Sequence, residues 1–298
     1  MGNQTVVSEF FLVGFSDIPQ WNMLLVLAFT FSYIWTLSGN TFILSLIIFD
    51  SGLHTPMYFF LSNLCVLDIC CISVTAPQFL YMFYHLHYSV SFSNCITQVY
   101  FYLAFTNVQF FLLPVMAYDR YRAICNPLRY HVFMSKRACV SLAVGTWAFG
   151  FINTLSYRIS HLIYCISPVI NHFFCDLTAV MKLSCSDTST IEHFTFIEGV
   201  LCGFLPLSLQ CILKIHSSDG RQKAFSTCAS HLTVVILFYG TVLVMHMRPS
   251  SHYLLAQDKP LSVLYTAIIP ILNPLIYSLR NKNVKKALGE IPRFYLHK

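Results

Sequence analysis

Seven long apolar runs constrain the fold of this chain more than any other feature. Each is about 20 residues or longer, the length that an α-helix needs to cross roughly 30 Å of hydrocarbon. Backbone polar groups inside a bilayer must pair within the chain, so the runs are expected to be helices rather than open strands. They are Met23–Phe49, Met57–Met82, Cys95–Met116, Ala138–Tyr157, Phe194–Ile215, Phe225–Met247 and Leu261–Leu279. The pattern predicts an all-α membrane protein, a seven-transmembrane helix bundle.

Charge composition supports a membrane location and predicts its orientation. Only 10% of the 298 residues are charged, against about 25% in soluble domains. No Lys or Arg precedes Arg120, and most of the rest lie in three stretches, Arg120–Arg137, Lys214–Lys223 and Arg280–Lys298. Basic loops stay on the cytoplasmic side of a membrane. We therefore expect an extracellular N-terminus (residues 1–22), a transmembrane bundle (23–279) and a cytoplasmic tail (280–298).

The two ends of the chain carry weaker signals that agree with this orientation. Asn3 begins a glycosylation sequon, which has meaning only outside the cell. In the tail, Val284, Ala287 and Leu288 recur at helical spacing among lysines. This spacing is typical of a short amphipathic helix lying on membrane lipid, and a solvated basic tail is the alternative. The net charge of +6 is thus assigned to topology and lipid attraction, and no nucleic-acid partner is expected.

An acid and an arginine stand next to each other at the end of the third predicted span, in Met116-Ala117-Tyr118-Asp119-Arg120-Tyr121. Such a pair at a membrane boundary can hold together while the bundle is closed and separate when a protein partner enters. The alternative is that Arg120 only anchors the helix at the interface.

This stretch resembles the signature of olfactory (odorant) receptors, which are rhodopsin-like G-protein-coupled receptors. Three further segments resemble the same family: Leu53–Leu61 at the start of the second span, Lys223–Leu232 at the start of the sixth, and Pro270–Asn281 at the end of the seventh. The four segments occur in the expected order and extend over nearly the whole chain.

The resemblance implies a receptor that binds a small volatile odorant and activates a heterotrimeric G protein of the stimulatory olfactory type, which raises cyclic AMP. It implies that Arg120 contacts the G protein and that Asp119 restrains Arg120 at rest. Tyr121, Asn273, Pro274 and Tyr277 complete the implied switch, with Pro274 as a hinge. A static kink at Pro274 is the alternative. The protein is not expected to be an enzyme or to need a cofactor, since no catalytic set or phosphate-binding loop is evident.

Two sets of residues inside the bundle are implied by the same resemblance. The first is a buried polar network of Asn40, Asp68, Gln109 and Asn273, since polar groups in a membrane are expensive unless they satisfy one another. The second is a ligand pocket in the outer half, formed by Tyr102, Leu103, Thr106, Asn107, Tyr239, Val242, Leu243, His246, Ser262, Tyr265 and Thr266. Each of these residues could equally serve helix packing.

Four of the twelve cysteines are expected on the outer, oxidising side: Cys95, Cys165, Cys175 and Cys185. Four cysteines allow three pairings. The resemblance implies Cys95–Cys175 and Cys165–Cys185. Zinc binding with His161 or His172 is the alternative, although no metal is expected.

Several positions depart from the family pattern. The fifth span is about two helical turns short and contains no tyrosine, Gln109 replaces an acid opposite Asp68, and Arg122 replaces an apolar residue. Pro114 is expected to interrupt the third helix. These departures raise the alternative of a receptor relic with impaired signalling. A transporter or channel is a further alternative, disfavoured because the chain shows neither an internal repeat nor a line of charges.

Overall fold

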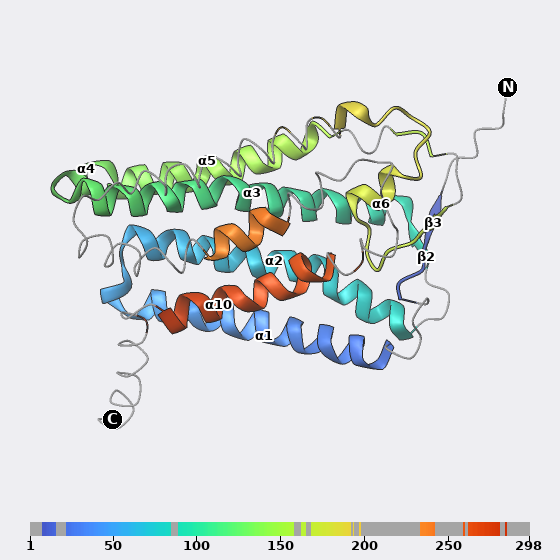
Figure 1. The fold of residues 1–298 in the computed structure, drawn as a ribbon, viewed down its shortest axis with the longest axis horizontal. Helices are drawn as coiled ribbons and strands as arrows, with labels where there is room; N and C mark the ends of the chain where they lie inside the picture. Colours follow the sequence, from blue (N-terminus) through green and yellow to red (C-terminus); the bar gives the residue numbers. More distant parts are fainter. Residues whose placement is uncertain are drawn as a thin grey trace.

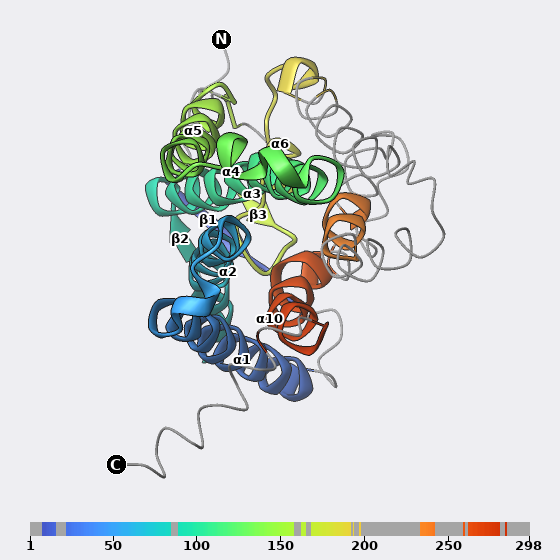
Figure 2. The same cartoon turned by 90° about the vertical axis from the view of Figure 1, so that its left-hand side faces the viewer.

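Long helices lying side by side make up most of the part of the chain that the structure describes (Figure 1). The computed structural model describes residues 8–15, 22–84, 89–157, 162–164, 168–191, 193, 197, 233–241, 259, 262–280 and 284. The long helices are α1 (Asn22–Phe49), α2 (Pro56–Tyr84), α3 (Phe92–Cys125), α5 (Lys136–Leu155) and α10 (Ile269–Arg280). Seen end on, they form an arc in the order α5, α3, α2, α1 and α10 (Figure 2).

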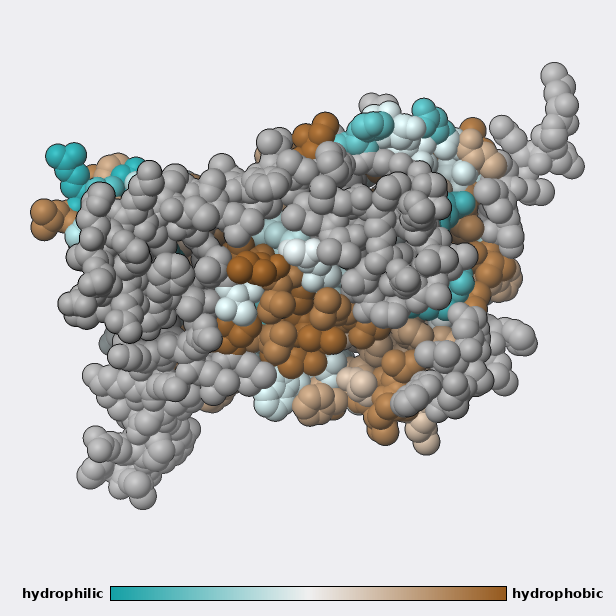
Figure 3. Space-filling model, in the orientation of Figure 1, coloured by the Kyte–Doolittle hydropathy of each residue, from teal (hydrophilic) through white to brown (hydrophobic). Residues whose placement is uncertain are grey.

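The helices confirm several of the predicted membrane spans. Four are long and apolar enough to cross a bilayer, over Met23–Phe49, Pro56–Phe83, Phe92–Ala123 and Lys136–Leu155. The described part of the seventh predicted span, residues 262–279, is also helical. The sixth is described only at 233–241, which is helical, and the fifth lies outside the described residues except for Ile197. On the face drawn in Figure 3, apolar side chains gather along the middle and hydrophilic ones toward the two ends.

The third helix is longer and more regular than its sequence suggests. It continues past Met116, the predicted end of the span, to Cys125, and Pro114 lies inside it without interrupting it. Proline removes one backbone hydrogen bond, but the neighbouring Leu113 and Met116 are buried in the core of the bundle. The expected interruption at Pro114 is therefore wrong, because packing on both sides of the proline maintains the helix.

At one end of the bundle, short helical segments make the connections. The segment η2 (Ser51–Leu53) joins α1 to α2, while η3 (Pro127–Arg129) and α4 (Tyr130–Phe133) join α3 to α5. The side chain of Ser135 accepts a hydrogen bond from the backbone N–H of Ala138 and so caps the start of α5. We call this end of the molecule the α4 end.

At the opposite end, three short strands close the bundle. The strand β1 (Glu9–Leu12) pairs antiparallel with β2 (Ser89–Ser91) and parallel with β3 (Val169–Ile170). The short helix α6 (Leu177–Met181) follows β3. Phe10 of β1 is fully buried, and its ring centroid lies 5.5 Å from that of Tyr164. We call this end the sheet end.

Two close helix contacts fix how the bundle packs. A Cβ added at Gly150 of α5 would lie 2.6 Å from Val108 Cγ2 and 2.7 Å from the Val108 backbone nitrogen on α3. A Cβ added at Gly39 of α1 would lie 3.3 Å from Cβ of Pro274 on α10. Small residues permit such approaches between membrane helices.

The seventh span contains an irregular turn. The π-helix η6 (Leu264–Ile268) precedes α10, and the backbone N–H of Ile269 bonds to the Leu264 carbonyl. Single π turns are rare and occur often at functional sites. Here the turn carries Tyr265 and Thr266, two residues of the predicted pocket.

Candidate functional site

The carboxylate of Asp119 organises the α4 end. Both Nε and Nη2 of Arg120 donate to Asp119 Oδ2, the former at 2.9 Å. The hydroxyl of Tyr130 donates to Asp119 Oδ1 at 2.6 Å. The Asp119 side chain is 1% exposed and that of Arg120 15%. The acid therefore holds the arginine on one side and the loop between α3 and α5 on the other.

Tyr130 was not anticipated from the sequence. Burial and then the hydrogen bond to the Asp119 carboxylate raise the pKa of Tyr130, so the phenol stays protonated and acts as a donor. Tyr130 begins α4, outside the membrane spans. Only the fold of the loop brings it to Asp119, so no local spacing could have indicated the contact.

Arg122 has aromatic partners at the same end. Its Nε donates to the Tyr118 hydroxyl at 2.8 Å. Its guanidinium carbon lies 3.9 Å from the centroid of the Phe133 ring and 5.0 Å from that of Tyr118. Cation–π contacts of this kind attach the loop to the end of α3. Tyr121 lies between these residues on α3 and is partly exposed.

Three of the four predicted network residues meet in the middle of the bundle. Asp68 accepts hydrogen bonds from Gln109 Nε2 at 3.1 Å and from Asn273 Nδ2 at 2.9 and 3.1 Å. These bonds link α2, α3 and α10 through one buried carboxylate. Amide donors at both contacts offset the cost of burying a polar acid inside the bundle.

Asn40 does not join this network through a hydrogen bond. Its Nδ2 donates to the Thr36 carbonyl at 2.9 Å within α1, and its Oδ1 has no hydrogen-bond partner among the described residues. The prediction of a four-residue network is thus corrected to three. Asn40 is fully buried and serves its own helix instead.

Pro274, the predicted hinge, packs at the contact between α10 and α1, beside Gly39. Tyr277 follows on the next turn of α10, and its side chain lies outside the part of the chain that the structure describes.

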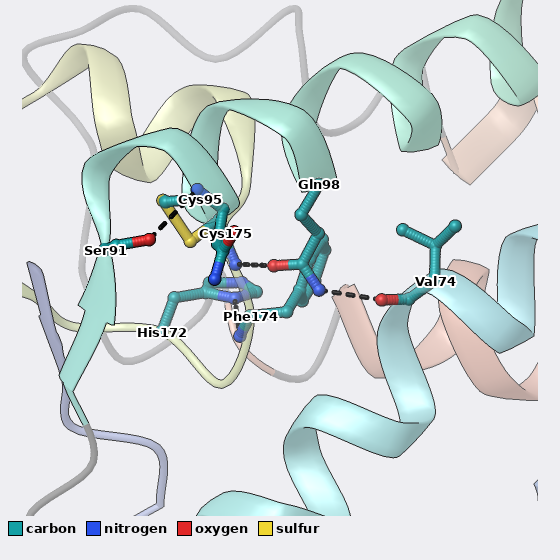
Figure 4. The surroundings of a disulfide bond; sticks show 8 residues. Val74, Ser91, Cys95, Gln98, His172, Phe174 and Cys175 are labelled. Atoms are coloured by element: carbon teal, nitrogen blue, oxygen red, sulfur yellow. Dashed lines mark hydrogen bonds between the residues drawn. A yellow bond between two sulfur atoms is a disulfide. The ribbon is translucent and has the colours of Figure 1, made fainter.

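At the sheet end, a disulfide joins Cys95 of α3 to Cys175, the two cysteines that the resemblance pairs. Figure 4 shows Gln98 beside this bond. Gln98 Oε1 accepts from the Cys175 backbone N–H at 2.9 Å, and its Nε2 donates to the Val74 carbonyl of α2 at 2.7 Å. One amide therefore connects two helices and the loop before α6.

The same loop is also tied to the seventh span. His172 Nε2 and Ser262 Oγ lie 2.9 Å apart, and the Tyr265 hydroxyl donates to Asp176 Oδ1 at 3.1 Å. The ring of Tyr102 lies 5.9 Å from that of Tyr265 and 5.4 Å from that of Phe174, centroid to centroid. Three predicted pocket residues, Tyr102, Ser262 and Tyr265, thus meet beneath the loop.

The remaining predicted pocket residues have other partners. Leu103 packs with the core at the sheet end, and the hydroxyls of Thr106 and Thr266 donate to the carbonyls of Tyr102 and Ser262 in their own helices.

Asn107 has a hydrogen-bond partner on a neighbouring helix. Its Nδ2 donates to Thr154 Oγ1 on α5 at 3.0 Å, and the side chain is buried between the two helices. Tyr239 lies deeper in the bundle, where its hydroxyl donates to the Phe110 carbonyl at 2.7 Å.

Several predicted sites fall on residues that the structure does not describe. They are Val242, Leu243 and His246 of the pocket, Asn3 of the sequon, and Cys165. Cys185 takes part in a disulfide, but its predicted partner Cys165 lies outside the described residues, so that pairing stays a prediction. Within the described ranges, no group of three His, Cys, Asp or Glu side chains is placed to hold a metal.

Comparison with known proteins extends over nearly the whole chain. The family model for the olfactory receptor matches residues 29–295. The chain is 46% identical to human olfactory receptor 13C9 (Homo sapiens) over 312 residues, which cover 98% of each protein. It is also 46% identical to mouse olfactory receptor 5AR1 (Mus musculus) over 303 residues, 97% of each. The chain therefore belongs to the olfactory receptor family, whose members are G-protein-coupled signalling receptors and not enzymes.

Proposed function

We propose that this chain is an odorant receptor that binds small volatile ligands in the outer half of a seven-helix bundle. Binding activates a heterotrimeric G protein of the stimulatory olfactory type and raises cyclic AMP. Membership of the olfactory receptor family supports the proposal, and the geometry of α3 carries it.

The observation that supports this proposal most strongly is that α3 joins two different sites as one continuous helix. Tyr102 meets Tyr265 and Phe174 at the sheet end, and Arg120 is paired with Asp119 at the α4 end. Tyr102 and Arg120 are eighteen positions apart, which corresponds to about 27 Å along the axis of a helix. A ligand that moves the outer part of α3 against its neighbours would therefore also act on the ion pair.

We place the sheet end outside the cell and the α4 end in the cytosol. The disulfide at the sheet end suits an oxidising compartment, and Arg120, Arg122, Arg129 and Lys136 gather near the α4 end. With this orientation, we propose seven spans, with a glycosylated Asn3 and a Cys165–Cys185 bond outside the cell. We also propose a C-terminal amphipathic helix on the inner leaflet. Val284 of that segment is buried with the apolar core.

The proposed pocket would hold its ligand mainly by dispersion. Aromatic rings and a few hydroxyls are the groups that meet beneath the loop, at Tyr102, Ser262 and Tyr265. Pockets for small molecules combine such apolar walls with one or two polar groups that orient the ligand. Val242, Leu243 and His246 are proposed to complete the lining from the sixth helix.

The proposed G-protein contact combines the arginine with an apolar anchor. Leu128 of η3 is 99% exposed and Val132 of α4 is 76% exposed, in the loop that Tyr130 holds to Asp119. Exposed apolar side chains beside a releasable charge are typical of a surface that binds a protein partner.

An odorant panel screened by cyclic AMP, with surface staining in parallel, tests the proposal. The matched variants are Arg120→Ala and Arg129→Ala, which remove one arginine each from the same cytoplasmic region. We expect Arg120→Ala to abolish the response at equal surface density and Arg129→Ala to retain it. An equal response from both variants, or a response in cells without a stimulatory Gα subunit, would contradict the proposal.

A second candidate is a receptor with impaired signalling. The observation that favours it is the short fifth span, which contains no tyrosine between its first residue, Phe194, and its last, Ile215. Inserting two helical turns there should then raise the ligand-evoked cyclic AMP response. An unchanged response at equal surface density would count against impairment by this cause.

A further inference from the structure

We propose that a sterol binds in a groove on the lipid-facing side of the bundle, between α2 and α3 near the sheet end. The groove has a cavity volume of about 400 Å³. The lining comes from α2, from β2 and from α3: Val74, Pro77 and Gln78, then Val90, then Asn94, Thr97, Gln98 and Phe101. Pro77, Thr97 and Phe101 are exposed, so the groove opens away from the residues proposed to hold the odorant.

Pro77 and Gln98 explain why a groove forms here. Pro77 has no backbone N–H and crowds the preceding turn of α2, which weakens the local hydrogen bonds of that helix. Gln98 reaches across from α3 and donates to the Val74 carbonyl at 2.7 Å, while its oxygen accepts from Cys175 N–H (Figure 4). The amide bridges the two helices and forms the back wall of the groove.

Within the two spans, the lining of the groove changes from polar to apolar with depth in the membrane, and Val90 of β2 lines it beyond the α3 span. The outer ends of the two spans are Phe83 on α2 and Phe92 on α3. At 1.5 Å per residue, Asn94 and Thr97 lie about 3 and 8 Å inside the α3 end, and Phe101 about 14 Å. On α2, Gln78 lies about 8 Å inside and Val74 about 14 Å. An amphiphile with its polar group toward the outer surface matches this gradient.

The lining selects the kind of amphiphile. Its side chains are amide, hydroxyl or apolar, and none carries a charge. A phospholipid headgroup would need a cation for its phosphate, whereas a single hydroxyl is satisfied by the amides of Asn94 and Gln78. A rigid ring system also loses less conformational entropy on binding than two acyl chains. Both arguments favour a sterol.

The test uses the full-length receptor in phosphatidylcholine nanodiscs that contain a photoreactive cholesterol analogue. Cross-linked peptides are mapped by mass spectrometry, with excess cholesterol or excess phosphatidylserine as competitor. We expect labelling concentrated at residues 74–78 and 94–101, and competition by cholesterol alone. Labelling spread evenly over the lipid-facing helices, or removed by phosphatidylserine, would overturn the proposal.

A pair of matched variants tests whether the cross-linking arises from sterol bound in this groove. Thr97→Phe fills the groove, and Val144→Phe adds the same ring to α5, where Val144 is 62% exposed. We expect Thr97→Phe to reduce groove labelling at least tenfold and Val144→Phe to leave it unchanged. Asn94→Leu, which removes one polar partner, should weaken sterol competition about three- to tenfold, the effect of one hydrogen bond. Equal labelling of Thr97→Phe and Val144→Phe would contradict the site.

Discussion

The two ends of α3 are held by different kinds of interaction. At the sheet end, α3 is joined to the loop by the Cys95–Cys175 disulfide, and Gln98 links that loop to α2. The strands β1, β2 and β3 cover the same end. At the α4 end, Asp119 holds Arg120 by an ion pair and Tyr130 by a hydrogen bond, with no covalent link. One end is covalently fixed, and the other is held by contacts that can be exchanged.

This difference indicates how the two ends divide the work of a receptor. A disulfide does not open during a binding event, so the sheet end can keep the geometry of a ligand site constant. Arg120, whose side chain is 15% exposed, can exchange Asp119 only for a group of another protein that offers equivalent hydrogen bonds, because leaving a buried charge unpaired is costly. We therefore propose that the sheet end acts as a frame and the α4 end as a switch.

Removing the covalent link should have the largest effect. Cys175→Ala opens a connection between residues 80 apart in sequence, and loss of such a bond costs about 2–5 kcal/mol of stability. We expect lower surface density and a lower melting temperature in detergent. Cys125→Ala, at an exposed free cysteine, is the control. Equal melting temperatures for the two variants would show that the frame does not depend on the bond.

The second-largest effect is expected from weakening the Asp119–Arg120 ion pair at the α4 end. Asp119→Asn removes the charge that holds Arg120, and a hydrogen bond to a charged group contributes about 1.5–3 kcal/mol. We expect basal cyclic AMP to rise about tenfold at equal surface density, since the resting state loses that stabilisation. Tyr130→Phe removes one neutral donor and should give a smaller rise. If neither variant changes the basal signal, the α4 end is not a switch.

The close contact between Gly150 of α5 and Val108 of α3 predicts different stability effects for two glycine substitutions on α5. Gly150→Ala places a methyl group against the Val108 backbone, and overpacking of this kind costs about 1–3 kcal/mol. Gly145→Ala, for which no atom lies within 4 Å of the added carbon, should be neutral or stabilise α5 by up to about 1 kcal/mol. Thermal unfolding of the two variants measures the difference, and equal midpoints would contradict the close contact between α3 and α5.

The smallest effect is expected from losing one hydrogen bond at the sheet end. Tyr265→Phe removes the hydrogen bond to Asp176, which contributes about 0.5–1.5 kcal/mol. We expect the odorant concentration for half-maximal response to rise about three- to tenfold with basal cyclic AMP unchanged. Tyr33→Phe on α1 is the control. A rise in the basal signal instead would place the switch at the sheet end and reverse the comparison.

Long-range features of the fold were predictable from the sequence where one physical cause dominates. Membrane thickness sets the length of apolar runs, so the first four spans were located to within a few residues, apart from the end of α3 at the α4 end. The cost of polar groups in lipid indicated that Asp68 and Asn273 belong together, and hydrogen bonds join them.

Features that depend on how the chain folds back were not predictable. The strands of the sheet end have four residues or fewer, too short for an alternating pattern to show. The direction of Asn40 depends on Thr36 in its own helix, and that of Asn107 on Thr154 of α5. Tyr130 meets Asp119 only because of the loop between α3 and α5.

Distance measurements between spin labels test the division into frame and switch most directly. One pair would join Cys125 on α3 to a label at Lys223→Cys, near the start of the sixth span. The other would join Ser93→Cys to Lys182→Cys at the sheet end, with Cys125 replaced. Both distances are measured again in the Asp119→Asn variant with a nucleotide-free stimulatory Gα subunit present. The distance between Cys125 and Lys223→Cys should increase by several ångströms. The distance between Ser93→Cys and Lys182→Cys should stay constant. A constant first distance, or an equal change in both, would contradict the account.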